Sequence, residues 1–134
     1  MIHTAGLDVL LLERADHPGW WQSVTGSRES ADEPLAETAR REVREETGIE
    51  AGGGLADWSL SDTYTIYPEY RHRYAPGTIM NREHVFGLLV PRDVAIRLAP
   101  REHTAWRWLP ADAAAAACFS RTNASAIRRL TTPA

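Results

Sequence analysis

The sequence predicts an α/β sandwich with a mixed β-sheet. Short segments rich in apolar, aromatic and β-branched residues alternate with one long amphipathic segment, and the chain ends in two further helical segments. A length of 134 residues fits one domain, residues 1–134, with little room for a second. These observations together indicate the α/β class.

The first half of the chain contains two expected strands and one expected helix. Residues 8–13 (DVLLLE) form a short apolar run that is typical of a buried strand, and residues 20–25 (WWQSVT) are aromatic and β-branched enough for a second. A helix is expected over about residues 34–47, because Pro34 is tolerated at the first helical position and Gly48 is a natural C-terminal stop. The polar residues between the second strand and the helix predict a loop.

The second half contains three more strands and two more helices. Alternating or β-rich runs predict the strands, and the Ala-rich and final segments predict the helices, at residues 58–67, 83–90, 106–109, 110–119 and 123–130. Residues 68–81 (PEYRHRYAPGTIMN) lie between the first two of these strands and predict a basic, aromatic loop.

The composition excludes several classes of protein. With 15 basic and 18 acidic side chains the net charge is −3, which argues against a protein that coats nucleic acid or an anionic membrane. Apolar residues at 43% and charged residues at 25% argue against disorder. The longest apolar stretch, residues 113–119, is far shorter than the roughly 20 residues of a membrane-spanning helix. A single cysteine, Cys118, and no visible signal peptide indicate a reducing, cytoplasmic location.

The expected helix carries three glutamates on or beside its apolar side. At about 100° per residue, the apolar stripe centres near 55°, Glu46 lies inside it near 20°, and Glu42 and Glu45 lie along its edge. Carboxylates at this spacing repel one another, and an unpaired carboxylate that points toward a core is costly. Either these side chains reach solvent and pair with neighbouring arginines, or a hard divalent cation lies against them. The spacing alone leaves both interpretations open.

The wider pattern resembles the Nudix box, GX5EX7REUXEEXGU, in which U is a bulky aliphatic residue. Residues 41–49 (REVREETGI) match every specified position of its second half. Six residues rather than five separate Gly26 from Glu33, which indicates a one-residue insertion in a loop. The resemblance favours the cation over a solvated helix face. It implies the Nudix α/β/α sandwich, with the helix over about residues 34–47 as its central catalytic helix. It also implies a pyrophosphohydrolase that uses Mg²⁺, with Mn²⁺ as a substitute, to cut a phosphoanhydride bond.

The resemblance also implies roles for the residues of the box. Glu42, Glu45 and Glu46 would be metal ligands or would hold the base that activates water. Arg41 would be structural and would pair with loop acids such as Glu33.

Three further segments resemble one branch of the Nudix family, at residues 20–27 (WWQSVTGS), 71–77 (RHRYAPG) and 102–109 (EHTAWRWL). That branch removes pyrophosphate from 7,8-dihydroneopterin triphosphate in folate biosynthesis and leaves the monophosphate. Two alternatives stay open: hydrolysis of (deoxy)nucleoside triphosphates or dinucleoside polyphosphates, and a Nudix module that binds a nucleotide without turnover. In each case the expected partner is a small-molecule triphosphate, pterin or nucleotide, and neither nucleic acid nor membrane. The composition does not indicate the oligomeric state.

The resemblance extends the expected site beyond the helix. Arg71 and Arg73 concentrate positive charge where a triphosphate with about four negative charges would be held, and one of the two would reach phosphate if their side chains alternate. Glu102 would be a further metal ligand, with Glu83 as its rival. Substrate contacts are also expected at three positions that have ordinary alternatives as strand, sheet or connection residues: Arg14, Thr25 and Ser120.

Aromatic side chains offer a place for a flat pterin to stack. The candidates are Trp20, Trp21, Tyr64, Trp106 and Trp108. Of these, Trp106 and Trp108 are expected in the core. His84 and His103 are expected to be structural, because a hard-metal site needs no imidazole.

The N-terminus departs from the resemblance. Family members carry a long apolar strand and basic residues before the first hairpin, whereas here only a few residues, beginning Met1-Ile2-His3, precede the turn at Gly6. Loss of a central strand would expose the edges of both its neighbours. We therefore expect the natural start to lie upstream, and a chain extended upstream to have a higher unfolding midpoint than one that begins at Met1.

Overall fold

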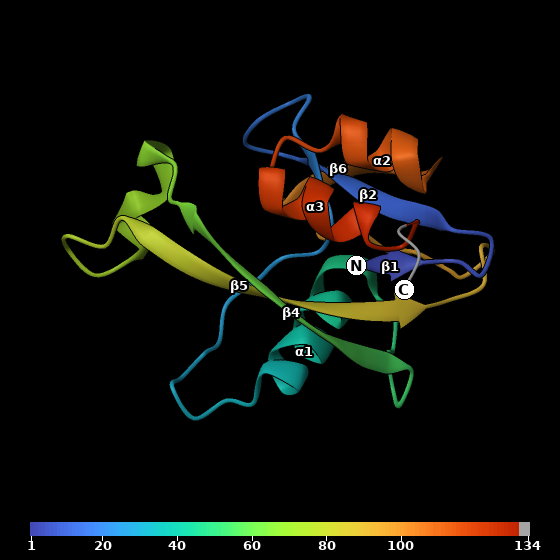
Figure 1. Cartoon of the computed structure of the whole chain (residues 1–134), viewed down its shortest axis with the longest axis horizontal. Coiled ribbons are helices and arrows are strands. Elements are labelled where there is room, and N and C mark those ends of the chain that lie inside the picture. Colours follow the sequence, from blue (N-terminus) through green and yellow to red (C-terminus); the bar gives the residue numbers. More distant parts are fainter. Residues whose placement is uncertain (132–134) are drawn as a thin grey trace.

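Within residues 1–131, which the computed structural model describes, a six-stranded sheet has α1 on one face and α2 and α3 on the other (Figure 1). The strands are β1 (Ile2–His3), β2 (Asp8–Arg14), β3 (Trp21–Gln22), β4 (Leu55–Thr65), β5 (Met80–Leu89) and β6 (His103–Pro110). The helices are α1 (Leu35–Thr47), α2 (Ala111–Ala117), α3 (Arg121–Arg128) and the 3-10 helix η1 (Pro68–Arg73). In the same residues, no helix is long and apolar enough to cross a membrane.

The sheet is mixed, as predicted, because β1 pairs differently with its two neighbours. It is antiparallel to β2, with His3 opposite Val9, and parallel to β5, with Ile2 opposite Leu88. The strand order is β3-β2-β1-β5-β4, and β6 pairs with β2 along its length. The two residues of β1 therefore join the half of the sheet that contains β2 and β6 to the half that contains β4 and β5.

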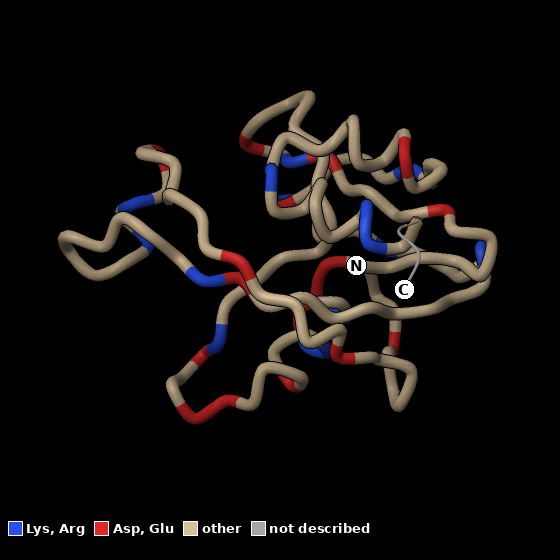
Figure 2. The backbone as a smooth tube through the Cα atoms, in the orientation of Figure 1, with Lys and Arg blue, Asp and Glu red and all other residues tan. Residues whose placement is uncertain are grey.

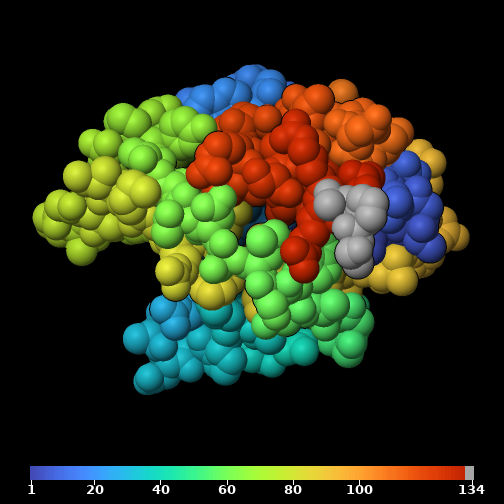
Figure 3. Space-filling view, in the orientation of Figure 1, coloured from blue at the N-terminus to red at the C-terminus, as the bar shows by residue number. Residues whose placement is uncertain are grey.

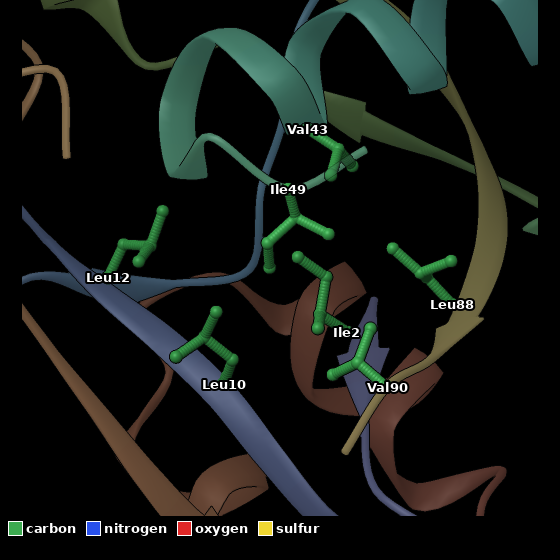
Figure 4. Close-up of a cluster of buried hydrophobic side chains, with 7 residues drawn as sticks. All are labelled: Ile2, Leu10, Leu12, Val43, Ile49, Leu88 and Val90. Carbon is green, nitrogen blue, oxygen red and sulfur yellow. The ribbon is translucent and has the colours of Figure 1, made fainter. Parts of the chain in front are cut away.

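Strand β2 supplies apolar side chains to both faces of the sheet. Successive side chains of a strand point to opposite faces. Val9 and Leu11 accordingly pack against α2 and α3, whereas Leu10 and Leu12 pack against α1. Figure 4 shows the α1 side, where side chains from β1, β2, α1, the loop after α1, and β5 with its C-terminal flank meet: Ile2, Leu10, Leu12, Val43, Ile49, Leu88 and Val90. This double burial confirms that residues 8–13 form a buried strand.

Helix α1 has the bounds and the buried face that its sequence predicts. It begins after Pro34, and it ends at Gly48, which adopts the left-handed conformation (φ 74°) that favours glycine. Val43 is 4% exposed and Glu46 only 1%, so the carboxylate does lie inside the apolar stripe. The helix thus places one acidic group in the interior.

Strand β3 is shorter than the predicted residues 20–25. Beyond Gln22 the backbone N–H of Ser23 donates to the side-chain oxygen of Asn123 at 3.0 Å, and not to a neighbouring strand. A side chain from α3 has taken the place of a ladder hydrogen bond. The chain then leads through a loop to α1.

The prediction that Trp106 lies in the core is wrong, whereas that for Trp108 is confirmed. Trp108 packs against the cluster on the α1 side, but Trp106 is 44% exposed. Both lie on β6, an edge strand of the described sheet that pairs with β2. Two residues along an edge strand are enough to move a side chain out from under the elements that cover the sheet.

The outer parts of β4 and β5, with η1 between them, extend beyond the rest of the sheet as an arm, residues 60–85 (Figure 1). The arm contacts the turn between β2 and β3: the Tyr70 hydroxyl donates to Asp16 at 3.0 Å, and the rings of Trp20 and Tyr67 lie 5.6 Å apart. Residues 68–81 of the arm carry Arg71 and Arg73 against one acidic residue, Glu69, whereas acidic residues outnumber basic ones in the loop that leads into α1 (Figure 2). The fold thus brings a basic segment and an acidic segment to the same end of the sheet.

Candidate active site

The last turn of α1 buries the carboxyl group of Glu46. Both of its side-chain oxygens are buried and accept no hydrogen bond from the described residues. Burial, together with the neighbouring Glu42 and the charge of Glu102, raises the pKa of Glu46 to about 10. A buried acidic group without a partner is costly, so its oxygens are available to a group that carries positive charge.

Two residues next to each other at the start of β6 meet this carboxyl group. Single oxygen or nitrogen atoms of Glu46, Glu102 and His103 all lie within 4.8 Å of one another. Glu102, predicted as an additional ligand, is therefore brought to Glu46. Its rival Glu83 interacts with Thr122 and Asn123 of α3, and burial raises the pKa of its carboxyl group.

Arg41 gathers the other acidic groups of the helix. Its guanidinium lies 2.7 Å from Glu42 and 3.5 Å from Glu45. It also lies 3.0 Å from Glu33, so the predicted pair between Arg41 and Glu33 forms despite the loop insertion. Hydrogen bonds from Arg41, Thr38 and the backbone lower the pKa of Glu33 to about 2. Glu42 is thereby held beside Glu46, while Glu45 is half exposed.

The loop before α1 makes room for Glu42 with a glycine. A Cβ atom built on Gly26 would lie 2.1 Å from the side-chain Cδ of Glu42, far closer than two carbon atoms can approach. The carboxyl end of Glu42 therefore lies directly against the backbone of the loop. This contact explains why the first position of the motif is a glycine: a larger residue would collide with Glu42.

Arg14, at the end of β2, is held on several sides. Its Nε donates to Asp16 at 2.8 Å, its Nη1 donates to Gln22 at 3.2 Å, and its Cζ lies 4.8 Å from the centre of the Tyr70 ring. Burial and the charge of Arg14 together lower the pKa of His103 to about 4, and Gln22 contacts both Arg14 and His103, which belongs to the carboxyl cluster. Thr25 is exposed, with its hydroxyl 3.5 Å from Gln22.

The two candidate arginines of η1 differ in their surroundings. Arg71 and Ser120 line a cavity of about 370 Å³ between η1 and the start of α3. Figure 3 shows these two segments side by side on one face of the molecule. Arg73 lies with its Cζ 4.8 Å from the centre of the Tyr70 ring. Ser120 also caps α3 by accepting from the backbone N–H of Asn123.

Trp20 is not free to stack on a ligand. Its ring lies 3.9 Å from that of His17 at 11° and 4.5 Å from that of Phe119 at 18°, so two nearly parallel rings occupy its faces. The Trp21 ring is covered by the guanidinium of Arg107 at 4.2 Å. A flat substrate would need another surface.

Sequence reasoning missed Gln22 and the contacts of His103. The Gln22 amide is buried, and its Nε2 lies 3.1 Å from Nε2 of His103. A polar side chain inside a strand-like apolar segment was the available signal for Gln22. No local pattern indicates a contact between residues 81 positions apart.

The acidic site is expected to make stability depend on pH. Between the ordinary pKa of about 4.5 and the raised value of about 10, folded Glu46 keeps a proton that the unfolded chain releases. Its contribution is therefore fully present below about pH 4.5 and is lost as the pH rises toward 10. Urea unfolding of metal-free wild type and Glu46→Gln, at several pH values from 5 to 9, measures this difference. The free energy of unfolding of the wild type should fall relative to that of the variant as the pH rises. A difference that stays constant with pH would contradict the raised pKa of Glu46.

The donors of the site fit a hard divalent cation. Glu46 offers two buried oxygens without hydrogen bonds, and Glu102 and Glu42 add carboxylates beside them. Carboxylate oxygens are the ligands that Mg²⁺ and Mn²⁺ prefer. With Arg14 close by, the arrangement can bind a cation together with a phosphate chain.

Comparisons with known proteins agree with this chemistry. Residues 2–130 match the NUDIX domain family. The chain is 42% identical over 124 residues to the dihydroneopterin triphosphate diphosphatase of Escherichia coli K12, which covers 90% of this chain and 81% of that protein. It is 38% identical to the protein of the same name from Haemophilus influenzae, covering 90% and 77%. The solved structure of the E. coli dihydroneopterin triphosphate pyrophosphohydrolase matches with a TM-score of 0.87 and 39% identity, over 96% of this chain and 88% of that one.

Proposed function

This chain belongs to the Nudix family of hydrolases, and from that premise we propose that it hydrolyses 7,8-dihydroneopterin triphosphate to the monophosphate and pyrophosphate. The observation that carries the proposal is the buried Glu46, whose oxygens accept no hydrogen bond from the described residues and which clusters with Glu102. The identity to the E. coli diphosphatase supports the pterin triphosphate as substrate.

The proposed cofactor is Mg²⁺, with Mn²⁺ as a substitute, held by the carboxylates Glu42, Glu45, Glu46 and Glu102. When bound, it would neutralise phosphate oxygens and lower the pKa of a coordinated water molecule. The residues of the chain then have separate tasks. Arg41 keeps Glu42 and Glu45 in place, and the acidic side chains hold a proton acceptor close to the attacking water.

The substrate is proposed to bind along the basic side of the site. Arg14 and Thr25 both contact Gln22, Arg71 and Ser120 line the cavity between η1 and α3, and the charges of Arg14 and Arg71 suit phosphate oxygens. Arg73, packed on Tyr70, would support the arm and add charge from a greater distance.

Replacing Arg71 is expected to weaken substrate binding more than replacing Arg73. Arg71→Ala should raise KM about tenfold to a hundredfold, equivalent to one charge-assisted hydrogen bond of about 1.5–3 kcal/mol, with a small change in kcat. Arg73→Ala should raise KM by less. Steady-state kinetics of both variants make the comparison. A larger effect for Arg73 would reverse the assignment of the phosphate contact.

The function itself is tested by the products of three substrates. The protein is incubated with Mg²⁺ and, separately, with dihydroneopterin triphosphate, dATP and ADP-ribose, and pyrophosphate release is measured. We expect the pterin to give by far the highest kcat/KM. A preference for dATP would favour a nucleotide hydrolase, hydrolysis of ADP-ribose alone would reject the proposal, and no turnover of any would favour a binding module.

A further inference from the structure

A buried amide connects Arg14 to the carboxyl cluster. Gln22 lies between Arg14 and His103: its Oε1 is 3.2 Å from Arg14 Nη1, and its Nε2 is 3.1 Å from His103 Nε2. Gln22 and His103 are both only 3% exposed, so water does not replace either contact. The Gln22 Nε2 has one longer contact besides, to the Thr25 hydroxyl at 3.5 Å, to which it also donates.

The chemistry of the donors fixes the direction of both contacts. A guanidinium can only donate, so the atom of Gln22 that faces Arg14 must be the carbonyl oxygen. The amide nitrogen then faces His103 and can also only donate. Consequently Nε2 of His103 must accept, and the ring is neutral with its hydrogen on Nδ1.

The atom that carries this hydrogen lies near the buried glutamate. His103 Nδ1 lies 3.5 Å from Oε1 of Glu46, and among the described residues neither atom makes a hydrogen bond. The distance is long for a hydrogen bond, but a small rotation of either side chain would shorten it. Among the side chains of Glu46, Glu102 and His103, only the imidazole carries an N–H group.

We propose that Gln22 and His103 are positioning residues, in which Arg14 orients Gln22, Gln22 fixes the tautomer of His103, and the His103 N–H holds Oε1 of Glu46 so that Oε2 is left for the cation. His103 is then not a metal ligand, although its ring lies within 4.8 Å of Glu46 and Glu102. A ligand role would need a lone pair on Nδ1 and a hydrogen on Nε2. That tautomer would force the Gln22 amide to turn, and its N–H groups would then face Arg14.

The tautomer can be measured directly, without reference to catalysis. Histidine is labelled with ¹⁵N, and two-bond ¹H–¹⁵N correlations are recorded near pH 7 with and without Mg²⁺. The His103 signals are identified by their loss in His103→Asn. We expect a hydrogen on Nδ1 and a bare Nε2 in both states. A hydrogen on Nε2 in either state would overturn the proposal.

A near-isosteric change at Gln22 tests the direction of the hydrogen bonds that join Arg14, Gln22 and His103. In Gln22→Glu, a carboxylate accepts from both Arg14 and His103, so a hydrogen should appear on Nε2. The matched control Asn81→Asp makes the same chemical change at a partly buried amide of the arm, which donates to Tyr64. It should leave the His103 spectrum as in the wild type. An unchanged His103 spectrum in Gln22→Glu would contradict the proposal that Gln22 fixes the tautomer of His103.

The catalytic effect is a separate measurement that rests on the proposed function. Gln22→Glu should lower kcat about tenfold to a hundredfold, the usual effect of changing a residue behind a metal ligand, with little change in KM. His103→Asn keeps an N–H near the position of Nδ1 and should be less impaired than His103→Leu. Equal losses of kcat in these two variants would show that the His103 N–H does not contribute to the reaction. If the pterin is not a substrate, the spectra still decide the tautomer.

Discussion

The Glu46→Gln variant is expected to lose at least about a thousandfold in kcat while remaining folded. The amide keeps the shape of the carboxyl group but removes the charge that would bind the cation, and a metal site supplies several kcal/mol of transition-state stabilisation. Burying a neutral amide costs less than burying a carboxylate. The thermal midpoint of the metal-free variant should therefore equal or exceed that of the wild type.

Steady-state kinetics with thermal unfolding measure both expectations. Glu37→Gln is the matched control, because Glu37 is an exposed residue of the same helix that pairs with Arg40 on the solvated face. It should retain wild-type kcat. Near wild-type activity in Glu46→Gln would show that Glu46 does not hold the metal.

Gly26→Ala is expected to have the second largest effect, about a hundredfold in kcat. The added Cβ would lie 2.1 Å from the Cδ of Glu42, so this side chain must leave its place beside Glu46 and Arg41. Because the displaced atoms are the end of a flexible side chain, the protein should still fold. Removing one preorganised charged group from an active site commonly costs about a hundredfold to a thousandfold in kcat.

Kinetics and unfolding of Gly26→Ala are compared with Gly53→Ala. A Cβ at Gly53 meets no atom within 4 Å, and this loop lies outside the site. The control should keep both activity and midpoint. If Gly26→Ala also keeps its activity, the position of Glu42 against the loop is not needed for the reaction.

The parts of the structure that depend on local pattern could be predicted from the sequence. The burial of Glu46 follows from helical geometry alone, since its angle places it within the apolar stripe. The pair between Arg41 and Glu33 follows from the motif and survives the insertion. The burial of β2 on both faces of the sheet could be predicted because its apolar residues follow one another without interruption.

The parts of the structure that depend on residues distant in the sequence could not be predicted. The length of β3 is set by Asn123, which is 100 residues further along the chain. The exposure of Trp106 depends on which elements cover β6, not on its neighbours in the sequence. The contact between Gln22 and His103 joins two segments that carry no shared pattern.

The most direct measurement is the anomalous diffraction of a crystal soaked in Mn²⁺. If the carboxylates of α1 bind a catalytic cation, the anomalous map should contain a peak within about 2.0–2.3 Å of an oxygen of Glu46, with Glu102 or Glu42 as a further ligand. The result that contradicts the account is an ordered site without such a peak, in which Glu46 remains buried with no ion against it.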